Sequence, residues 1–154
     1  MIKTIEGQPK IKGKKFCVVA SQFNEFVTRR LLDACLAELK RRGVKDNEIT
    51  VVWVPGAFEI PLVALKMAQK KTISAVICLG AVIRGETLHF DLIARAAAEG
   101  IAQAALQTQK PVIFGVLTTD TIQQAYKRSE PKGDNKGREA AVTAVKMVSL
   151  LRQI

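Results

Sequence analysis

Four apolar runs rich in β-branched residues constrain the fold more than any other feature of this 154-residue chain. The runs cover residues 16–20, 49–54, 73–83 and 111–118. None alternates between apolar and polar residues as a half-exposed strand does, so each is predicted to be a strand covered on both faces. Strands of this kind belong to parallel sheets that have helices packed against both faces.

Helical patterns separate the four runs. From Val27, apolar residues recur three and four positions apart until Gly43, which is predicted to end the first helix. The other helical patterns cover residues 58–70 (with Pro61 in the first turn), 89–108 and 137–152. Strands and helices that alternate in this way, with right-handed crossovers, predict an α/β fold: a three-layer sandwich with a central four-stranded parallel sheet.

The length of the chain suits one domain, predicted over residues 13–154, with residues 1–12 as an N-terminal arm. Met1 to Glu6 are compatible with a short strand, and Gly7-Gln8-Pro9 separates them from the core. An N-terminal strand of this kind often pairs with the sheet edge of a neighbouring subunit, and a frayed tail is the alternative.

The composition excludes several classes of protein. Apolar residues make up 48% of the chain and charged residues 25%, which is typical of a globular domain and not of a disordered tail. No stretch of 18 apolar residues is present, so no membrane span is predicted, and the lack of a secretory signal favours a cytoplasmic location. The three cysteines are predicted to be buried free thiols and not metal ligands: Cys17, Cys35 and Cys78.

The chain is strongly basic, with 24 Lys and Arg against 14 Asp and Glu and a net charge of +10. Such a charge fits nucleic acid, an anionic substrate or a membrane surface as a partner. The positive residues are spread along the sequence, however, and those at 40–42 and 70–71 follow helical patterns, where cations complement the helix dipole. Exposed aromatic residues do not interleave with them, so specific nucleic-acid binding is not expected.

Ligands of open α/β sheets bind outside the carboxyl ends of the strands. The loops that follow the four predicted strands are residues 21–24, 55–59, 84–87 and 118–120, and His89 comes just after the third loop. These segments hold aromatic rings, a carboxylate, hydroxyl groups, an arginine and the only histidine of the chain. We therefore predict a small-molecule site at this edge of the sheet.

Four residues of these loops are candidates for contacting an organic substrate. His89 is the only histidine of the chain, and an imidazole suits proton transfer because it can both accept and donate a proton, although a surface or capping histidine is the alternative. Phe23 and Phe58 follow strand ends, where an aromatic ring suits stacking on a planar heterocycle, and Glu59 can accept hydrogen bonds from it. Phe58 packed beneath its own helix is the competing interpretation.

Gly85-Glu86-Thr87 precedes the Ala-rich helix and is a candidate anion site. Backbone N–H groups at a helix N-terminus bind phosphate well, and Arg84, Arg128 or Lys136 would supply a cation. The alternative is that Gly85 serves a tight turn and Thr87 caps the helix.

Several motifs at consistent spacing resemble the lumazine synthase family. They are Val54–Pro61, Gly80–Asp91, Phe114–Asp120, and Asn135–Gly137 with Glu139–Ala141, and Ile83–Asp91 is the most specific stretch. The similarity runs from Phe16 to the C-terminus. It implies a flavodoxin-like fold and a transferase that carries out the penultimate step of riboflavin biosynthesis. In that step, 5-amino-6-(D-ribitylamino)uracil condenses with 3,4-dihydroxy-2-butanone 4-phosphate to give 6,7-dimethyl-8-ribityllumazine, phosphate and water, without a metal or cofactor.

The resemblance also implies a role for each matching residue. His89 transfers protons and Lys136 is a secondary candidate, while Glu86, Thr87 and Arg128 receive the phosphate. The residues expected to hold the ribitylaminouracil are Phe23, Ala57, Phe58, Glu59, Ala81, Val82, Ile83 and Phe114. By the same resemblance, Phe114, Arg128 and Lys136 come from an adjacent subunit.

Members of the family form homopentamers, and twelve pentamers often close into a hollow sixty-subunit icosahedral shell that can be associated with riboflavin synthase. This sequence departs from the family pattern at Gln22, where arginine is common, and at Arg95. A turn that is usually small and Gly-rich contains Glu130, Pro131 and Asp134. Two other classes remain open: a flavin- or nucleotide-binding module on the same sheet, and a basic scaffold or nucleic-acid-associated shell.

Overall fold

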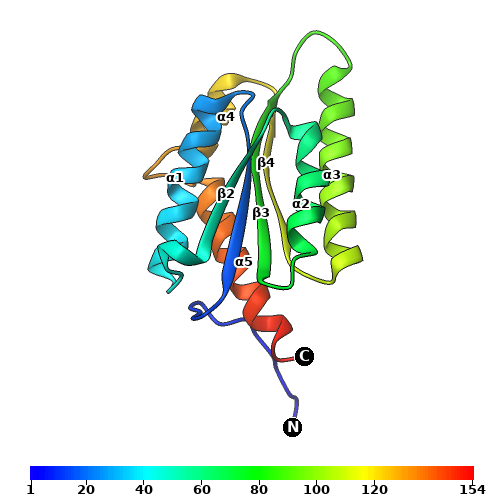
Figure 1. The fold of residues 1–154 in the computed structure, drawn as a ribbon. Helices are drawn as coiled ribbons and strands as arrows, with labels where there is room; N and C mark the ends of the chain where they lie inside the picture. The colour runs from blue at the N-terminus through cyan, green and yellow to red at the C-terminus, as the bar shows by residue number, and fades with distance from the viewer.

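The computed structural model describes all residues from 1 to 154 and contains a single parallel sheet. Its strands are β1 (Lys15–Ser21), β2 (Ile49–Val54), β3 (Ile73–Ile83) and β4 (Val112–Thr119), in the spatial order β2-β1-β3-β4. The helices are α1 (Glu25–Arg41), α2 (Ile60–Ala68), α3 (His89–Thr108), α4 (Ile122–Arg128) and α5 (Lys136–Leu151), and short 3-10 turns cover Asp46–Glu48 and Ala57–Glu59. Helices α1, α4 and α5 lie on one side of the sheet and α2 and α3 on the other (Figure 1). The predicted three-layer α/β fold is confirmed.

Helices cover both faces of the sheet, as the lack of alternation predicts, and the central strands β1 and β3 are the most deeply buried. In β1, Phe16 and Val18 pack into the core shared with α1 and α5, while Cys17 and Val19 pack into the core shared with α2 and α3. Every residue of β1 after Lys15 is buried. A strand with two apolar faces is stable only between two layers of helices. This explains why nearly every residue of β1 is apolar.

The bounds of β2, β3 and α3 agree with the sequence prediction, and Gly43 ends the first helix at a backbone φ of 103°, a left-handed conformation that favours glycine. Helix α4 was not predicted. It has seven residues and little apolar periodicity, and a reciprocal cap between Thr121 and Gln124 defines its start. No helix in the chain combines the length and the apolar character needed to cross a membrane.

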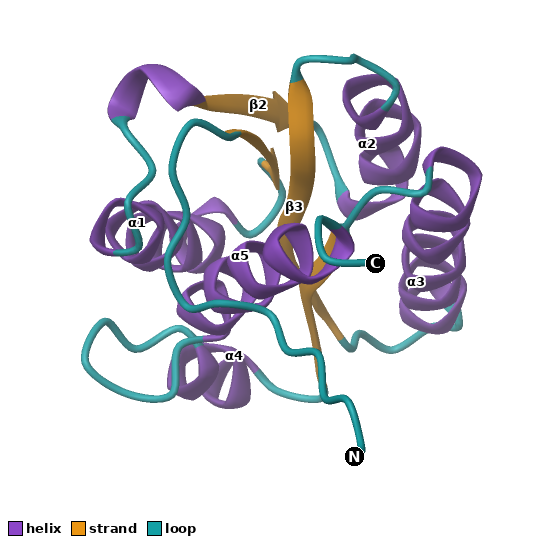
Figure 2. Cartoon of the chain, turned by 90° about the horizontal axis from the view of Figure 1, so that it is seen from below, coloured by secondary structure: helices purple, strands orange, loops and turns teal.

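The N-terminal segment is not a strand in the isolated chain; it runs as a coil beside the end of α5 (Figure 2). The backbone N–H of Gln8 donates to the hydroxyl of Ser149 at 2.9 Å, and the side-chain amide of Gln153 donates to the Glu6 carbonyl at 2.7 Å. Ile11 is buried in the core. The prediction that residues 1–6 pair with a neighbouring subunit concerns an assembly, and it stays a prediction.

The three cysteines are buried free thiols, as predicted. Burial raises the pKa of Cys17 to about 11 and that of Cys35 to about 12, and it raises the pKa of Cys78 as well. We expect the folded protein at pH 8 to resist a thiol reagent such as dithiobis(nitrobenzoic acid), and all three thiols to react once guanidinium unfolds the chain. Rapid labelling of the native protein would contradict this assignment.

The same pKa shifts have a consequence for stability at alkaline pH. Above the ordinary thiol value of 9.0, an unfolded chain releases protons that the folded chain still holds. The free energy of unfolding is therefore expected to fall as the pH rises above that value, and a chain with Cys35→Ala should lose part of this dependence.

Candidate functional site

A cavity of about 500 Å³ lies at the carboxyl edge of the sheet, where the sequence predicts the site. Residues from the ends of β1, β2 and β3 and from the start of α3 line it. The predicted site residues among them are Phe23, Ala57, Phe58, Glu59, Ala81, Val82, Ile83, Thr87 and His89. Residues that are more than sixty positions apart in the sequence thus surround one small-molecule-sized space.

Phe23 is held at this cavity by the loop that follows β1. Its backbone N–H donates to the Pro55 carbonyl at 3.0 Å, and that of Gln22 donates to the Val54 carbonyl at 2.8 Å. Asn24 adopts a left-handed backbone conformation, and its side-chain amide donates to the Ala81 carbonyl at 2.8 Å. Asn24 thereby connects the ends of β1 and β3. Sequence reasoning assigned it no role, although asparagine is among the few residues that adopt this conformation readily.

The two candidate aromatic rings are exposed, which is unusual for a core phenylalanine. Phe23 is 72% exposed and Phe58 is 59% exposed. Phe58 lies in the 3-10 turn that leads into α2, where Pro61 stands in the first turn as predicted. Phe58 is therefore not packed beneath its own helix, and both rings are available to a planar ligand.

The loop from Arg84 to Leu88 rises above the carboxyl edge and carries the chain to His89, the first residue of α3 (Figure 1). The Thr87 hydroxyl accepts a hydrogen bond from the backbone N–H of His89 at 3.3 Å. The cap position of α3 is Leu88, however, so Thr87 makes a local turn contact and does not cap the helix. Glu86, Thr87 and His89 also border a second, more open hollow on the outer side of this loop.

Arg84 attaches the loop to the neighbouring strand. Its backbone N–H donates to the Thr119 carbonyl at 2.8 Å, and its Nε donates to Asp120 Oδ1 at 2.7 Å. The guanidinium also lies 3.5 Å from Asp91 and 4.5 Å from the centre of the Phe90 ring. The hydrogen bond to Asp120 raises the pKa of Arg84. The Arg84 guanidinium therefore already interacts with carboxylates of its own chain, and for this reason Arg84 is less suited than Arg128 to bind an anion.

Phe114, Arg128 and Lys136 lie elsewhere. They border a separate cavity of about 540 Å³ along β4, α4 and α5, and this cavity shares no lining residue with the first one. Lys136 Nζ is 2.8 Å from Glu139 Oε2, and the Arg128 side chain is exposed. A single chain therefore does not bring these three residues to the cavity that contains His89.

Arg30 of α1 holds the end of α4, which carries Arg128. Its Nε donates to the Ser129 carbonyl at 3.1 Å and its Nη2 to the Tyr126 carbonyl at 3.4 Å. The guanidinium lies 5.3 Å from the centre of the Tyr126 ring. A cation at the last carbonyls of a short helix fixes where that helix ends. The sequence contains no signal for this contact because Arg30 and Ser129 are 99 positions apart.

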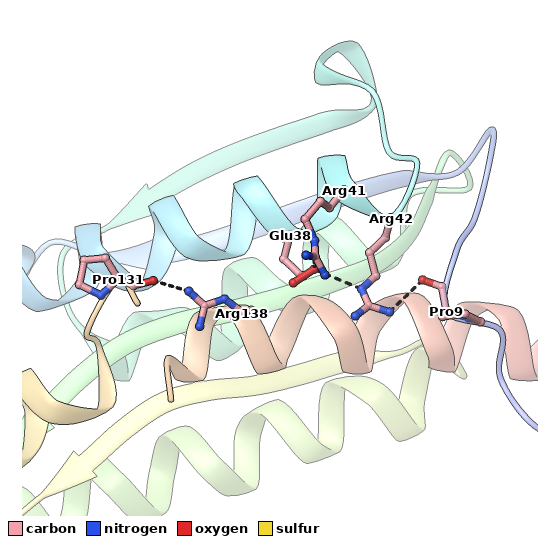
Figure 3. Close-up of polar contacts among 6 residues, drawn as sticks. All are labelled: Pro9, Glu38, Arg41, Arg42, Pro131 and Arg138. Carbon is pink, nitrogen blue, oxygen red and sulfur yellow. Dashed lines mark hydrogen bonds and ion pairs between the residues drawn. The ribbon is translucent and has the colours of Figure 1, made fainter. Parts of the chain in front are cut away.

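The turn between α4 and α5 is held by hydrogen bonds from within the chain. Asn135 caps α5 by accepting from the backbone N–H groups of Gly137 and Arg138, and its amide donates to the Glu130 carbonyl at 3.3 Å. Arg138 donates to the carbonyl of Pro131 (Figure 3). It also donates to the carbonyl of Gly133 at 2.7 Å. These hydrogen bonds fix the conformation of the turn that contains Glu130, Pro131 and Asp134.

The parallel sheet and the cavity at its carboxyl edge define an open α/β protein with a binding site at its strand ends. The family model described as 6,7-dimethyl-8-ribityllumazine synthase matches residues 13–152, which is nearly the whole chain. The chain belongs to this family. Its class is that of the transferase-type enzymes of riboflavin biosynthesis.

Proposed function

We propose that the protein condenses 5-amino-6-(D-ribitylamino)uracil with 3,4-dihydroxy-2-butanone 4-phosphate to form 6,7-dimethyl-8-ribityllumazine, with release of phosphate and water. Family membership supports this reaction. The observation that carries it is the meeting of Phe23, Phe58, Glu59 and His89 around one cavity of about 500 Å³. Its two exposed rings and single carboxylate suit a planar heterocycle with a hydroxylated side chain.

In this proposal the pyrimidine stacks on Phe23, while residues 57–59 and 81–83 contact the ring and the ribityl chain. The phosphate of the second substrate lies at Glu86 and Thr87, next to the start of α3, where free backbone N–H groups of the first helical turn can donate to an anion. Arg128 supplies the bidentate cation, and Lys136 stands nearby as the secondary candidate.

The site is proposed to be complete only between two subunits. Phe114, Arg128 and Lys136 border a cavity that is separate from the one with His89, so a second copy must bring them there. A cyclic assembly joins one surface of each subunit to a different surface of the next, as this arrangement requires. We propose a homopentamer, with further association into a shell and with riboflavin synthase as extensions of the same proposal. The outer edges of β2 and β4 have no partner strand, and either can receive residues 1–6 of a neighbour.

In the proposed reaction, the main roles of the protein are to position two reactive molecules and to transfer protons. The 5-amino group attacks the ketone and one water leaves to form a Schiff base, and phosphate is then eliminated. The ribitylamino nitrogen closes the ring onto the second carbonyl carbon with loss of a second water. His89 accepts and returns protons at these stages. Holding both substrates in one site supplies most of the acceleration, because it converts an encounter of two molecules into a reaction within one complex.

His89→Ala is therefore expected to slow turnover without abolishing it. General acid–base catalysis contributes about 10²-fold or more, whereas positioning of the substrates is unchanged in this variant. The assay follows the absorbance of the lumazine and the release of phosphate with both substrates present. No product from the correctly assembled wild-type protein would refute the proposed reaction, and an unchanged rate in the variant would refute only the role of His89.

A further inference from the structure

The positive charge of this chain collects at one end of the molecule. In a parallel sheet every strand starts at the same edge, so the segments that lead into the strands meet there. These segments are residues 10–15, 40–48, 69–72 and 109–111, and Figure 2 looks onto the end of the molecule where they lie. We call their surface the amino-end surface. It contains eleven of the 24 Lys and Arg residues and only two of the 14 Asp and Glu residues.

The rest of the chain is nearly neutral, with 13 Lys and Arg against 12 Asp and Glu. The net charge of +10 is therefore almost entirely a property of the amino-end surface. Charge that is concentrated in this way creates a directed field, whereas the same charge spread evenly would mainly affect solubility.

Some of these cations have structural partners. Glu38, only 5% exposed, accepts from Arg41 Nε at 3.0 Å and from Arg42 Nε at 3.3 Å, and Arg42 also donates to the Pro9 carbonyl at 3.0 Å (Figure 3). These contacts attach the N-terminal segment to the end of α1. The two arginines are thus accounted for by the fold.

Two lysines are partnered as well. Lys40 lies 3.5 Å from Asp46, and Lys110 Nζ donates to the carbonyls of Lys70 and Ile73 at 2.7 and 2.9 Å. The other lysines of the surface have no carboxylate within ion-pair distance, and all but the half-buried Lys14 are exposed: Lys10, Lys12, Lys14, Lys15, Lys45, Lys70 and Lys71.

Helix dipoles do not explain all of these free lysines. Lys70 follows the end of α2, where a cation is favourable. Lys10, Lys12, Lys14 and Lys15 instead lead into β1, and a strand offers no comparable dipole. Four like charges within six residues repel one another, so the fold gains nothing evident from them and a bound anion would relieve the repulsion.

We propose that the amino-end surface binds the phosphate backbone of nucleic acid without reading its bases. Lysines on flexible stems suit phosphates at varied spacing, and several together give affinity through counterion release. No large exposed apolar or aromatic side chain belongs to the four segments, so the surface has no platform for stacking bases. The same lack disfavours a membrane, because stable attachment to lipid takes an apolar anchor in addition to a basic patch.

This surface lies far from the proposed active site. β3 has 11 residues and spans about 35 Å from the amino edge to the carboxyl edge, at about 3.3 Å per residue. The binding proposed here therefore does not rest on the proposed reaction. It should persist when Phe23 or His89 is replaced.

The test measures fluorescence anisotropy of a labelled mixed-sequence DNA duplex and of a labelled oligo(dT) strand, between 50 and 200 mM salt. The full-length protein is compared with a Lys12→Gln, Lys14→Gln, Lys15→Gln variant. The control, Arg95→Gln, Lys127→Gln, Lys132→Gln, removes the same number of positive charges, all at exposed positions outside the amino-end surface. For the duplex, each lost phosphate contact should lower the slope of log affinity against log salt by about 0.9. We expect at least a tenfold loss of affinity at about 100 mM salt in the first variant and a small loss in the control.

Three results would overturn the proposal. The first is that the wild-type protein binds neither nucleic acid at 50 mM salt. The two triple variants, each checked for unchanged assembly and thermal midpoint, can lose affinity equally, which would show that only net charge matters. Finally, binding to vesicles of phosphatidylcholine and phosphatidylserine without binding to nucleic acid would assign the surface to membranes.

Discussion

Arg128→Ala is expected to lower kcat/KM for the phosphate-bearing substrate by about 100-fold or more, mainly through KM. Removing one partner of a hydrogen-bonded charge pair typically costs about 2–5 kcal/mol, which corresponds to about 30-fold to several thousand-fold and includes the expected loss. The Arg128 side chain is exposed in the isolated chain, so its loss should not disturb folding. The measurement is the two-substrate assay with each substrate varied in turn.

The matched control for this variant is Lys127→Ala, which removes an exposed cation from the same helical turn. It should leave both KM values close to those of the wild-type protein. Arg128→Lys keeps the charge but loses the bidentate geometry, and we expect it to recover only part of the activity. An unchanged KM for the phosphate-bearing substrate in Arg128→Ala would contradict the assignment.

The same variant tests whether the site spans two subunits. Arg128→Ala and Phe23→Ala chains can be unfolded, mixed in equal amounts and reassembled. If Phe23 and Arg128 of one site come from different subunits, random mixing leaves about a quarter of the sites with both wild-type residues. Activity well above that of either variant alone would support a composite site. No recovery in a mixed assembly would place both residues in the same chain's site.

Gly137→Ala is expected to destabilise the protein by about 3 kcal/mol, a large loss for one added carbon. Gly137 is buried near the start of α5, and a Cβ there would lie 2.0 Å from the carbonyl oxygen of Leu31 in α1. The obstacle is backbone, so α1 and α5 would have to move apart. Overpacking of this kind costs about 1–3 kcal/mol and occasionally more, which outweighs the helix preference for alanine.

The predicted loss corresponds to a fall of about 6–12 °C in the thermal midpoint for a chain of this size, measured at fixed protein concentration. Gly85→Ala is the control, since a Cβ at Gly85 meets nothing within 4 Å. It should leave the midpoint unchanged within about 2 °C. A Gly137→Ala protein as stable as the wild type would mean that the two helices can separate at little cost.

Much of the fold was predictable because continuous apolar runs have few physical solutions. A strand such as β3 is apolar on both faces and therefore requires a layer of helices on each side. This requirement predicts the three-layer sandwich before any tertiary contact is known. The edge of the sheet that holds the cavity was predictable for a similar reason: the loops after parallel strands converge, and four of them carried polar or aromatic residues. Helix α4 escaped prediction because a seven-residue helix leaves almost no periodic pattern.

The residues that hold the site in place were the least predictable part. Arg84 attaches the loop before His89 to Asp120, and Arg30 attaches the end of α4 to α1. In the sequence, Arg84 is instead a candidate for anion binding, and Arg30 looks like an ordinary surface cation. Their partners lie 36 and 99 positions away. Contacts at such separations depend on how the layers pack, and no local pattern encodes them.

The sequence by itself determined the class of fold, the edge of the sheet where the cavity lies, and the family motifs, because each depends on local composition and order. Only the tertiary structure decided which residues meet. It separated Arg128 and Lys136 from the cavity that holds His89, and it gathered lysines scattered between positions 10 and 110 at one end of the molecule. The physical reason is that charge and apolar character belong to single residues and can be recognised in the sequence. A site depends instead on the distances between residues that are far apart in the chain, and the packing of the layers sets those distances.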